Sequence, residues 1–228
     1  SKILMVTSAL QGEGKSTTAA NLAISFAQLG QPVILIDADL RRPKLHRTFN
    51  IPQTGGLVDI LSHGSSWQSV LQDSSLENLK ILLTGGRPHN PTELLSTYRM
   101  RALLDSLKEN FDIIIIDAPV TLTVPDVAIL VPETDGVLLV HDPAKSEKAV
   151  TIEAKKILDR AGAHLVGMIF NNVSSKQQKS YYGFNQDYSY TYGQTPVKPN
   201  KTGSPIVDMR APENQQRWLT EARCDYDT

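Results

Sequence analysis

The chain has little of what several classes of protein depend on. Its 228 residues include one cysteine, Cys224, so no internal disulfide can form and a zinc site would lack a second thiol. No apolar run approaches the ~20 residues that a membrane-spanning helix needs. The formal net charge is only −1, which gives no electrostatic footprint for nucleic acid. These absences predict a soluble protein of a reducing compartment that does not bind nucleic acid.

What the sequence does contain is a regular alternation of apolar strands and helices. The strands are apolar on both faces, and helical segments separate them, which is typical of a parallel sheet covered on both sides. We therefore expect an α/β fold with a mostly parallel central sheet and helices on both faces. The expected strands are residues 2–8, 32–39, 79–86, 112–119, 135–143 and 165–173, and the expected helices are residues 16–30, 91–111 and 147–161.

The composition changes near residue 174. Residues 175–228 are rich in Ser, Gln, Asn, Lys, Tyr and Pro, and they lack apolar periodicity. Such a segment cannot bury enough apolar surface to offset its ordering entropy, so we predict a flexible tail after a domain at residues 1–174. A cluster at residues 181–192 holds five of the seven tyrosines, and a low-complexity linker is the alternative interpretation. These are Tyr181, Tyr182, Tyr188, Tyr190 and Tyr192.

The sharpest chemical signal is ALQGEGKST at residues 9–17. The strict phosphate-loop pattern has Gly where Ala9 stands, but a strand leads into this loop and a helix leads out of it. In that geometry Lys15 reaches the β- and γ-phosphates, Ser16 binds Mg²⁺ and Thr17 lies near the α-phosphate. We therefore predict a P-loop NTPase-like fold. The predicted nucleotide contacts are Gly12, Glu13, Gly14, Lys15, Ser16 and Thr17.

Three carboxylates follow predicted strands and are expected to face that loop. Asp117 ends the apolar run IIIID, which is the Walker B position, while Asp37 and Asp39 end a second strand and Arg41 follows them. An Asp after a strand is often only a turn former. Beside a Lys-Ser loop, the three together favour metal chemistry instead. The predicted Mg²⁺ ligands are Ser16, Asp37 and Asp117.

Together these stretches resemble the catalytic domain of the bacterial protein-tyrosine kinases that accompany capsule and exopolysaccharide export. The three nucleotide motifs of that family appear as MVTSALQGEGKST, ILIDADLRR and IIIIDAPV. Further family stretches appear in order from GGLVDIL through GGRPHNPTELLST and GVLLV to GMIFNNV. The resemblance covers residues 2 to about 173, and the tyrosine cluster extends it to Tyr192.

The resemblance implies that ATP, with Mg²⁺, is the phosphoryl donor and that the tail tyrosines of another subunit are the acceptors. Such autophosphorylation in trans would regulate capsular or exopolysaccharide synthesis and export. Asp37 or Asp39 would polarise the acceptor phenol, whose pKa is near 10. The implied catalytic residues are Lys15, Asp37, Asp39 and Asp117.

Three polar residues have more open assignments. Arg41 could orient the acceptor loop or a neighbouring subunit, although an Arg after a strand is often simply solvated. Asn171 and Asn172 end the last predicted strand and are candidates for the adenine edge, or they are turn-forming residues.

The resemblance also implies partners. In the family, activity depends on a membrane activator of the chain-length-regulator type, either separate or fused upstream. That places the chain in the cytoplasm, at the inner face of the plasma membrane. Family members usually carry a helix before the first strand that mediates ring assembly. Here the first strand begins at Lys2, so we expect a ring only in a fuller protein.

The main competing hypothesis is a Min/Par-type nucleotide-switched ATPase without kinase activity. Those ATPases carry an additional lysine early in the phosphate loop, where this chain has Leu10. They also have no use for five clustered tyrosines. The competitor predicts ATP hydrolysis or ATP-dependent dimerisation with no phosphate on the tail.

Overall fold

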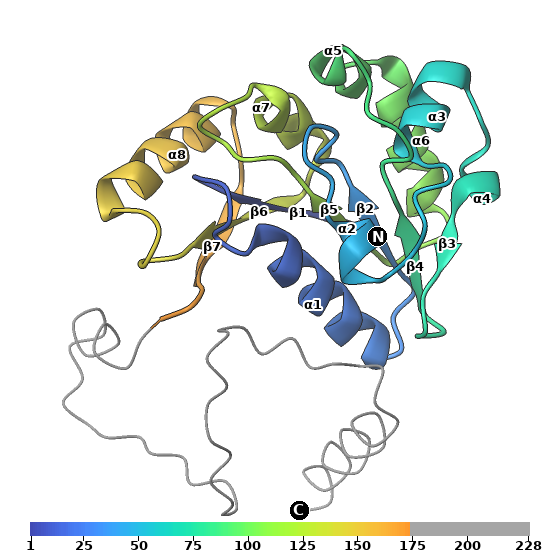
Figure 1. Cartoon of the computed structure of the whole chain (residues 1–228), viewed down its shortest axis with the longest axis horizontal. Helices are drawn as coiled ribbons and strands as arrows, with labels where there is room; N and C mark the ends of the chain where they lie inside the picture. The colour runs from blue at the N-terminus through green and yellow to red at the C-terminus, as the bar shows by residue number, and fades with distance from the viewer. Residues whose placement is uncertain (174–228) are drawn as a thin grey trace, which may run out of the picture. The chain divides into compact units, whose positions relative to one another are not determined.

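A seven-stranded sheet runs through the part of the chain that the structure, a computed structural model, describes, residues 1–173 (Figure 1). The strand order is β3-β4-β2-β5-β1-β6-β7, and every neighbouring pair is parallel except β3 with β4. This confirms the predicted mostly parallel α/β fold. The strands are β1 Lys2–Ser8, β2 Val33–Asp37, β3 Gln72–Asp73, β4 Leu79–Leu82, β5 Ile113–Asp117, β6 Gly136–His141 and β7 Leu165–Phe170.

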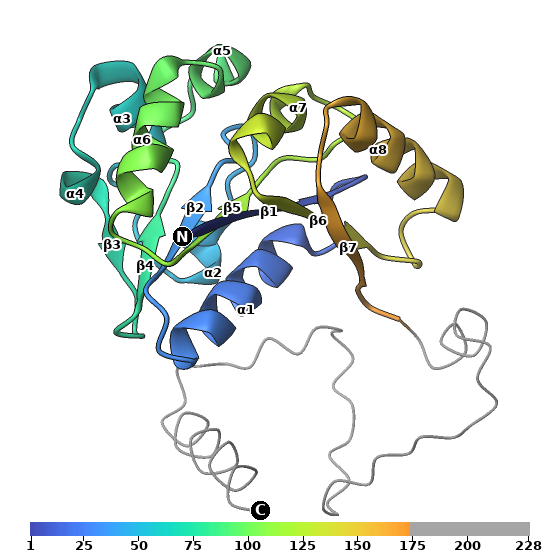
Figure 2. The same cartoon turned by 180° about the vertical axis from the view of Figure 1, so that it is seen from behind.

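Helices cover both faces of this sheet, as Figures 1 and 2 show from opposite sides. α1 and α2 lie on one face, and α3, α5, α6, α7 and α8 lie on the other. The helices are α1 Lys15–Gln28, α2 Leu45–Thr48, α3 Leu57–His63, α4 Trp67–Val70, α5 Pro91–Leu95, α6 Tyr98–Lys108, α7 Asp126–Leu130 and α8 Lys148–Arg160, with a 3₁₀ turn at Val131–Glu133.

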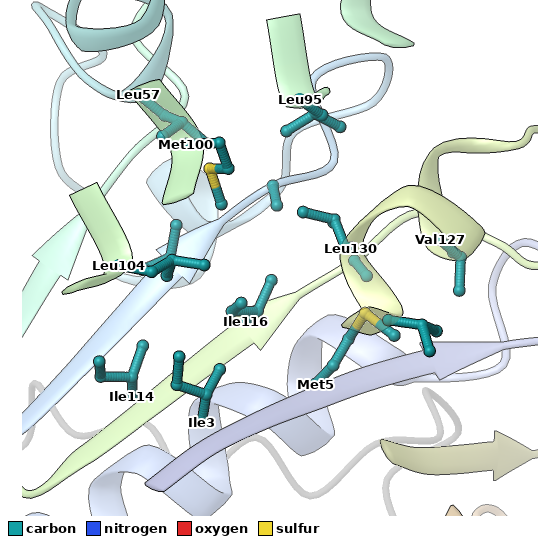
Figure 3. Close-up of a cluster of buried hydrophobic side chains, with 14 of the residues drawn as sticks. Ile3, Met5, Leu57, Leu95, Met100, Leu104, Ile114, Ile116, Val127 and Leu130 are labelled. Atoms are coloured by element: carbon teal, nitrogen blue, oxygen red, sulfur yellow. The ribbon is translucent and has the colours of Figure 1, made fainter. Parts of the chain in front are cut away.

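Two hydrophobic cores follow from the alternation of side chains along the buried strands. In β5, Ile114 and Ile116 belong to the core beneath α6 and α7, whereas Ile115 belongs to the core beneath α1. Figure 3 shows the first core, where side chains from α6 and α7 meet those of β1 and β5. The second core uses small residues, because α1 buries Ala19, Ala20, Ala23 and Ala27 against the sheet. α1 can therefore lie close to the strands.

The prediction of one continuous helix at residues 91–111 is wrong. Residues 91–111 do not form a single helix, because α5 ends at Leu95 and α6 begins at Tyr98. Thr97 between them has an extended backbone, with ψ at 152°. The Ser96 and Thr97 hydroxyls donate to the carbonyls of Glu93 and Leu94, and such bonds compete with helix continuation. α5 contacts the loop after β2, where Arg41 donates to Thr92.

The carboxyl ends of the central strands meet at one edge of the sheet. Asp37 at the end of β2 pairs in register with Asp117 at the end of β5, and Asp117 pairs with Val6 of β1. The loop after β1 therefore starts beside both carboxylates. Open α/β sheets bind ligands at this edge.

Candidate functional site

The loop between β1 and α1 has the shape of a phosphate-binding loop. Gly12 and Gly14 both have positive φ, at 86° and 98°, which favours glycine. α1 begins directly after the loop, so its first backbone N–H groups point toward the sheet edge where an anion would bind. The predicted contact residue Ser16 is buried and Thr17 is exposed.

Lys15 lies between two of the predicted carboxylates. Its Nζ is 2.8 Å from Asp39 Oδ2 and 3.3 Å from Asp117 Oδ1, and all three side chains are nearly or fully buried. Burial lowers the pKa of Lys15, but the charges of Asp117 and Asp39 outweigh it and the pKa rises. Burial also raises the pKa of Asp117, against the opposing effect of Lys15. The structure thus brings these three predicted residues together.

Asp37 is held by backbone donors rather than by Lys15. Its Oδ2 accepts the N–H groups of Lys44 and Leu45, each at 3.1 Å, and its Oδ1 accepts that of Asp39 at 3.3 Å. Burial and the neighbouring charge of Asp117 raise the pKa of Asp37 to about 7. Asp37 therefore titrates near neutral pH, and it forms no ion pair within residues 1–173, although the charge of Lys15 partly opposes the rise of its pKa.

This set of donors fits a divalent cation. The Oδ2 atom of Asp117 is buried and has no hydrogen-bond partner in the described chain. Asp39 and Asp117 share the single ammonium of Lys15, and Asp37 is held by backbone N–H groups alone, so the site is short of positive charge. Within residues 1–173 no group of three or more His, Cys, Asp or Glu side chains is arranged to hold a metal ion by itself. Mg²⁺ suits such a site, because one or two carboxylates bind it with phosphate oxygens and water.

The Glu13 side chain points into the protein, so the predicted contact of Glu13 with the nucleotide would be made by its backbone N–H group and stays a prediction. Its Oε2 accepts the Leu10 N–H at 2.6 Å, and its Oε1 accepts the Asp142 N–H at 3.3 Å and the Ser146 hydroxyl. The Nδ1 of buried His141 lies 3.6 Å from the same Oε1. Sequence reasoning missed His141, which ends β6, and Asp142 and Ser146, which follow it. Their polar run HDPAKS directly after a buried strand was the one available signal.

Arg41 is engaged within the chain. Its Nε and terminal nitrogen donate to both oxygens of Asp126, at 2.8 and 3.1 Å, and the Asp126 side chain is fully buried. The same terminal nitrogen donates to Thr92 at 2.8 Å. The pairing joins the loop after β2 to α5 and α7. The predicted contact of Arg41 with an acceptor loop or another subunit stays a prediction.

Asn171 and Asn172 follow β7 and lie beside the phosphate loop. Asn171 Nδ2 donates to the carbonyl of Glu13 at 2.9 Å, and Asn172 Nδ2 lies 3.5 Å from Asp142 Oδ2. Gly14 has a φ of 98°, and a Cβ there would be 2.0 Å from Asn171 Nδ2, so another residue would be strained and would displace the Asn171 side chain. Both asparagines therefore border the loop, while their contact with adenine stays a prediction. The five tail tyrosines lie outside the described residues.

Comparisons of the sequence with known proteins identify relatives over most of its length. The family model of the AAA domain matches residues 1–150. The tyrosine-protein kinase YwqD of Bacillus subtilis is 42% identical over 189 residues, which are 82% of this chain and 80% of that protein. The putative tyrosine-protein kinase EpsB of Ralstonia nicotianae is 34% identical over 92% of this chain but only 27% of its own length.

Solved structures agree with the fold and separate the two hypotheses. The kinase domain of the Escherichia coli tyrosine kinase ETK is 31% identical, with a TM-score of 0.74 over 85% of this chain and 72% of that one. MinD of Pyrococcus horikoshii, the more distant structure, is 23% identical with a TM-score of 0.64, over 78% of this chain and 76% of that one. That likeness shows a shared fold alone. The chain therefore belongs to the AAA domain family and, within it, to the bacterial tyrosine-protein kinases.

Proposed function

We propose that this chain transfers the γ-phosphoryl group of ATP to tyrosines of its own tail, at residues 181–192, in a second copy of the chain. The observation that carries the proposal is the position of Lys15, whose ammonium lies between Asp39 and Asp117 at the mouth of the phosphate loop. Two facts support phosphoryl transfer: the chain belongs to a family of tyrosine kinases, and its Lys15 lies between two carboxylates at the phosphate loop.

Each side chain has a part that its contacts support. Asp117, through its unpartnered Oδ2, and the Ser16 hydroxyl would hold Mg²⁺, with Asp37 close by. The ion would neutralise charge on the phosphate oxygens. Lys15 would turn from Asp39 toward the transferring phosphoryl group. That movement frees Asp39 Oδ2 to accept the phenol proton as the tyrosine oxygen attacks.

The proposed organisation is a kinase domain at residues 1–174 followed by a substrate tail at 175–228. In the described residues no helix is long and apolar enough to cross a membrane. The relative EpsB is several times longer than the part that this chain matches. We therefore propose that a chain-length-regulator-type membrane partner, separate or fused upstream, keeps the kinase at the inner face of the plasma membrane. Ring assembly and control of capsular or exopolysaccharide synthesis belong to the same proposal.

The test is phosphate mapping by mass spectrometry after incubation of the 228-residue chain with MgATP, alone and with the membrane partner. We expect phosphotyrosine within residues 181–192 in the wild type. Lys15→Met should abolish it, whereas Lys2→Met, which removes an exposed lysine from β1, should leave it unchanged. Phosphotyrosine that persists in Lys15→Met would contradict the proposal. ATP hydrolysis without any phosphotyrosine would support the Min/Par-type ATPase instead.

A further inference from the structure

The loop after β6, residues 142–147, lies directly against the phosphate loop. Glu13 binds both ends of its first turn, through the Asp142 N–H and the Ser146 hydroxyl. The turn itself is closed by bonds from the N–H groups of Lys145 and Ser146 to the Asp142 carbonyl, at 2.9 and 3.0 Å. The two loops are therefore one hydrogen-bonded unit, although 133 residues separate Glu13 from Ser146.

Lys145 projects from this turn over the phosphate loop. Its Nζ donates to the carbonyl of Gly12, and a Cβ built on Gly12 would lie 3.4 Å from that Nζ. The nearest carboxylate oxygen that it pairs with, Asp142 Oδ2, is 3.8 Å away. The Lys145 side chain is half exposed, and an ammonium has three donors. Donors thus remain for a ligand that enters the loop.

The balance of charges at the site indicates what the Lys145 ammonium would bind. The phosphate loop has one lysine, Lys15, and two buried carboxylates already neutralise it. A nucleoside polyphosphate brings several further negative charges to the same place.

We infer that Lys145 is a nucleotide-binding residue whose ammonium pairs with the phosphate oxygens of a nucleoside di- or triphosphate. The inference deepens the proposed function, because it adds to the phosphate site a cation from a loop outside the sequence motifs. Glu13 is the positioning residue that fixes this loop against Gly12.

The test measures MgADP and MgATP affinity by calorimetry on the full 228-residue chain at low and moderate salt. Lys145→Met should weaken both affinities about tenfold and reduce their dependence on salt, since one ion pair with phosphate is lost. Lys145→Arg, which keeps the charge, should stay within about twofold of the wild type. Lys148→Met is the matched control, because it removes an exposed lysine three residues later, and it should bind like the wild type.

Two results would overturn the inference. If Lys145→Met binds like Lys148→Met, the ammonium does not touch the nucleotide. If Lys145→Met and Lys145→Arg lose affinity equally and both unfold at lower temperature, Lys145 only braces the loop. The two proposals fail separately: nucleotide binding that depends on Lys145 in a chain without phosphotyrosine refutes the kinase proposal alone. A wild type that binds no nucleotide refutes both.

Discussion

At the scale of single residues, the site is governed by a shortage of positive charge. Asp37, Asp39 and Asp117 are all buried around Lys15, and the pKa values of Asp37 and Asp117 are raised. Buried carboxylates whose pKa is raised lower the stability of the fold while no cation is bound, and they favour the binding of a cation. Stability and activity should therefore respond in opposite directions to the loss of one carboxylate.

Asp117→Asn tests that opposition. We expect phosphotyrosine formation to fall at least about 100-fold, because the cation loses its unpartnered oxygen ligand. Stability to urea without Mg²⁺ should stay equal or rise, since one of the charges that raises the pKa of Asp37 is gone. Asp112→Asn, at the exposed opposite end of the same strand run, should change neither quantity. Substantial loss of stability in Asp117→Asn would show that its charge holds the fold together.

The pH dependence of stability has a definite sign. The pKa of Asp37 rises from 3.8 to about 7 in the folded chain, so between these values the folded state binds more protons than the unfolded state. Unfolding free energy without metal should therefore fall as pH rises from about 4 to 7, by at most about 4 kcal/mol. Urea denaturation at pH 5 and pH 8 measures it. Mg²⁺ should reduce the fall, and so should Asp117→Asn; a rise toward pH 8 in metal-free protein would contradict the assignment.

The sequence was enough to predict which residues form the site, but it was not enough to predict all of their contacts. Lys15, Asp39 and Asp117 stand in recognisable local patterns, and the structure places the Lys15 ammonium within 3.3 Å of both carboxylates. The inward turn of Glu13 could not be predicted, because two of its three partners lie about 130 residues away and nothing in the sequence pairs them with Glu13. Lys145 escaped notice for the same reason.

At the scale of elements, the ion pair between Arg41 and Asp126 links two short helices, α5 and α7, to the loop after β2. α5 and α7 have five residues each, too few to be stable helices in isolation. Thr92 of α5 donates to Asp126 at 2.6 Å, so one buried carboxylate serves both helices and the loop after β2. This tertiary link holds α5 beyond the break at Ser96 and Thr97, and sequence periodicity contains no record of it.

The two partners of this ion pair should not be equivalent. Arg41→Met leaves the fully buried Asp126 without its cation and should cost about 2 kcal/mol, below the usual range for buried pairs because Arg41 is 37% exposed. Asp126→Asn leaves an arginine that can turn to water, and should cost about 1 kcal/mol or less. Urea denaturation of both variants and of the double mutant gives the coupling free energy between Arg41 and Asp126. A larger loss for Asp126→Asn would contradict this account.

At the scale of the whole molecule, the fold was the most predictable part, because buried parallel strands are continuous apolar runs. β2 is buried at every residue and β5 at all but its first, whereas β7 is only partly buried and has one neighbour within the described sheet. The alternation of these runs with helices was enough to predict the sheet. Short segments without long apolar runs, such as α2, α4 and β3, were not predicted.

The rates of hydrogen exchange should follow these differences in burial between the strands. We expect amides of β5 to exchange most slowly and those of β7 fastest among the parallel strands, as measured on peptides by mass spectrometry. Added MgADP should slow exchange in the phosphate loop and in residues 142–147 together, because Glu13 joins them. Protection of the phosphate loop alone would mean that the two loops open independently.

The contact between Asn171 and Glu13 has a consequence for how the protein is made. The phosphate loop leaves the ribosome well before the end of β7, and its Glu13 carbonyl bonds to an amide 158 positions later. At about 5–20 residues per second, the interval between them lasts roughly 8–30 seconds. During it, Gly14 faces an empty flank where Asn171 will later lie. The phosphate loop therefore gains this last hydrogen bond only after β7 has been made, so its surroundings are completed at the end of synthesis of the domain.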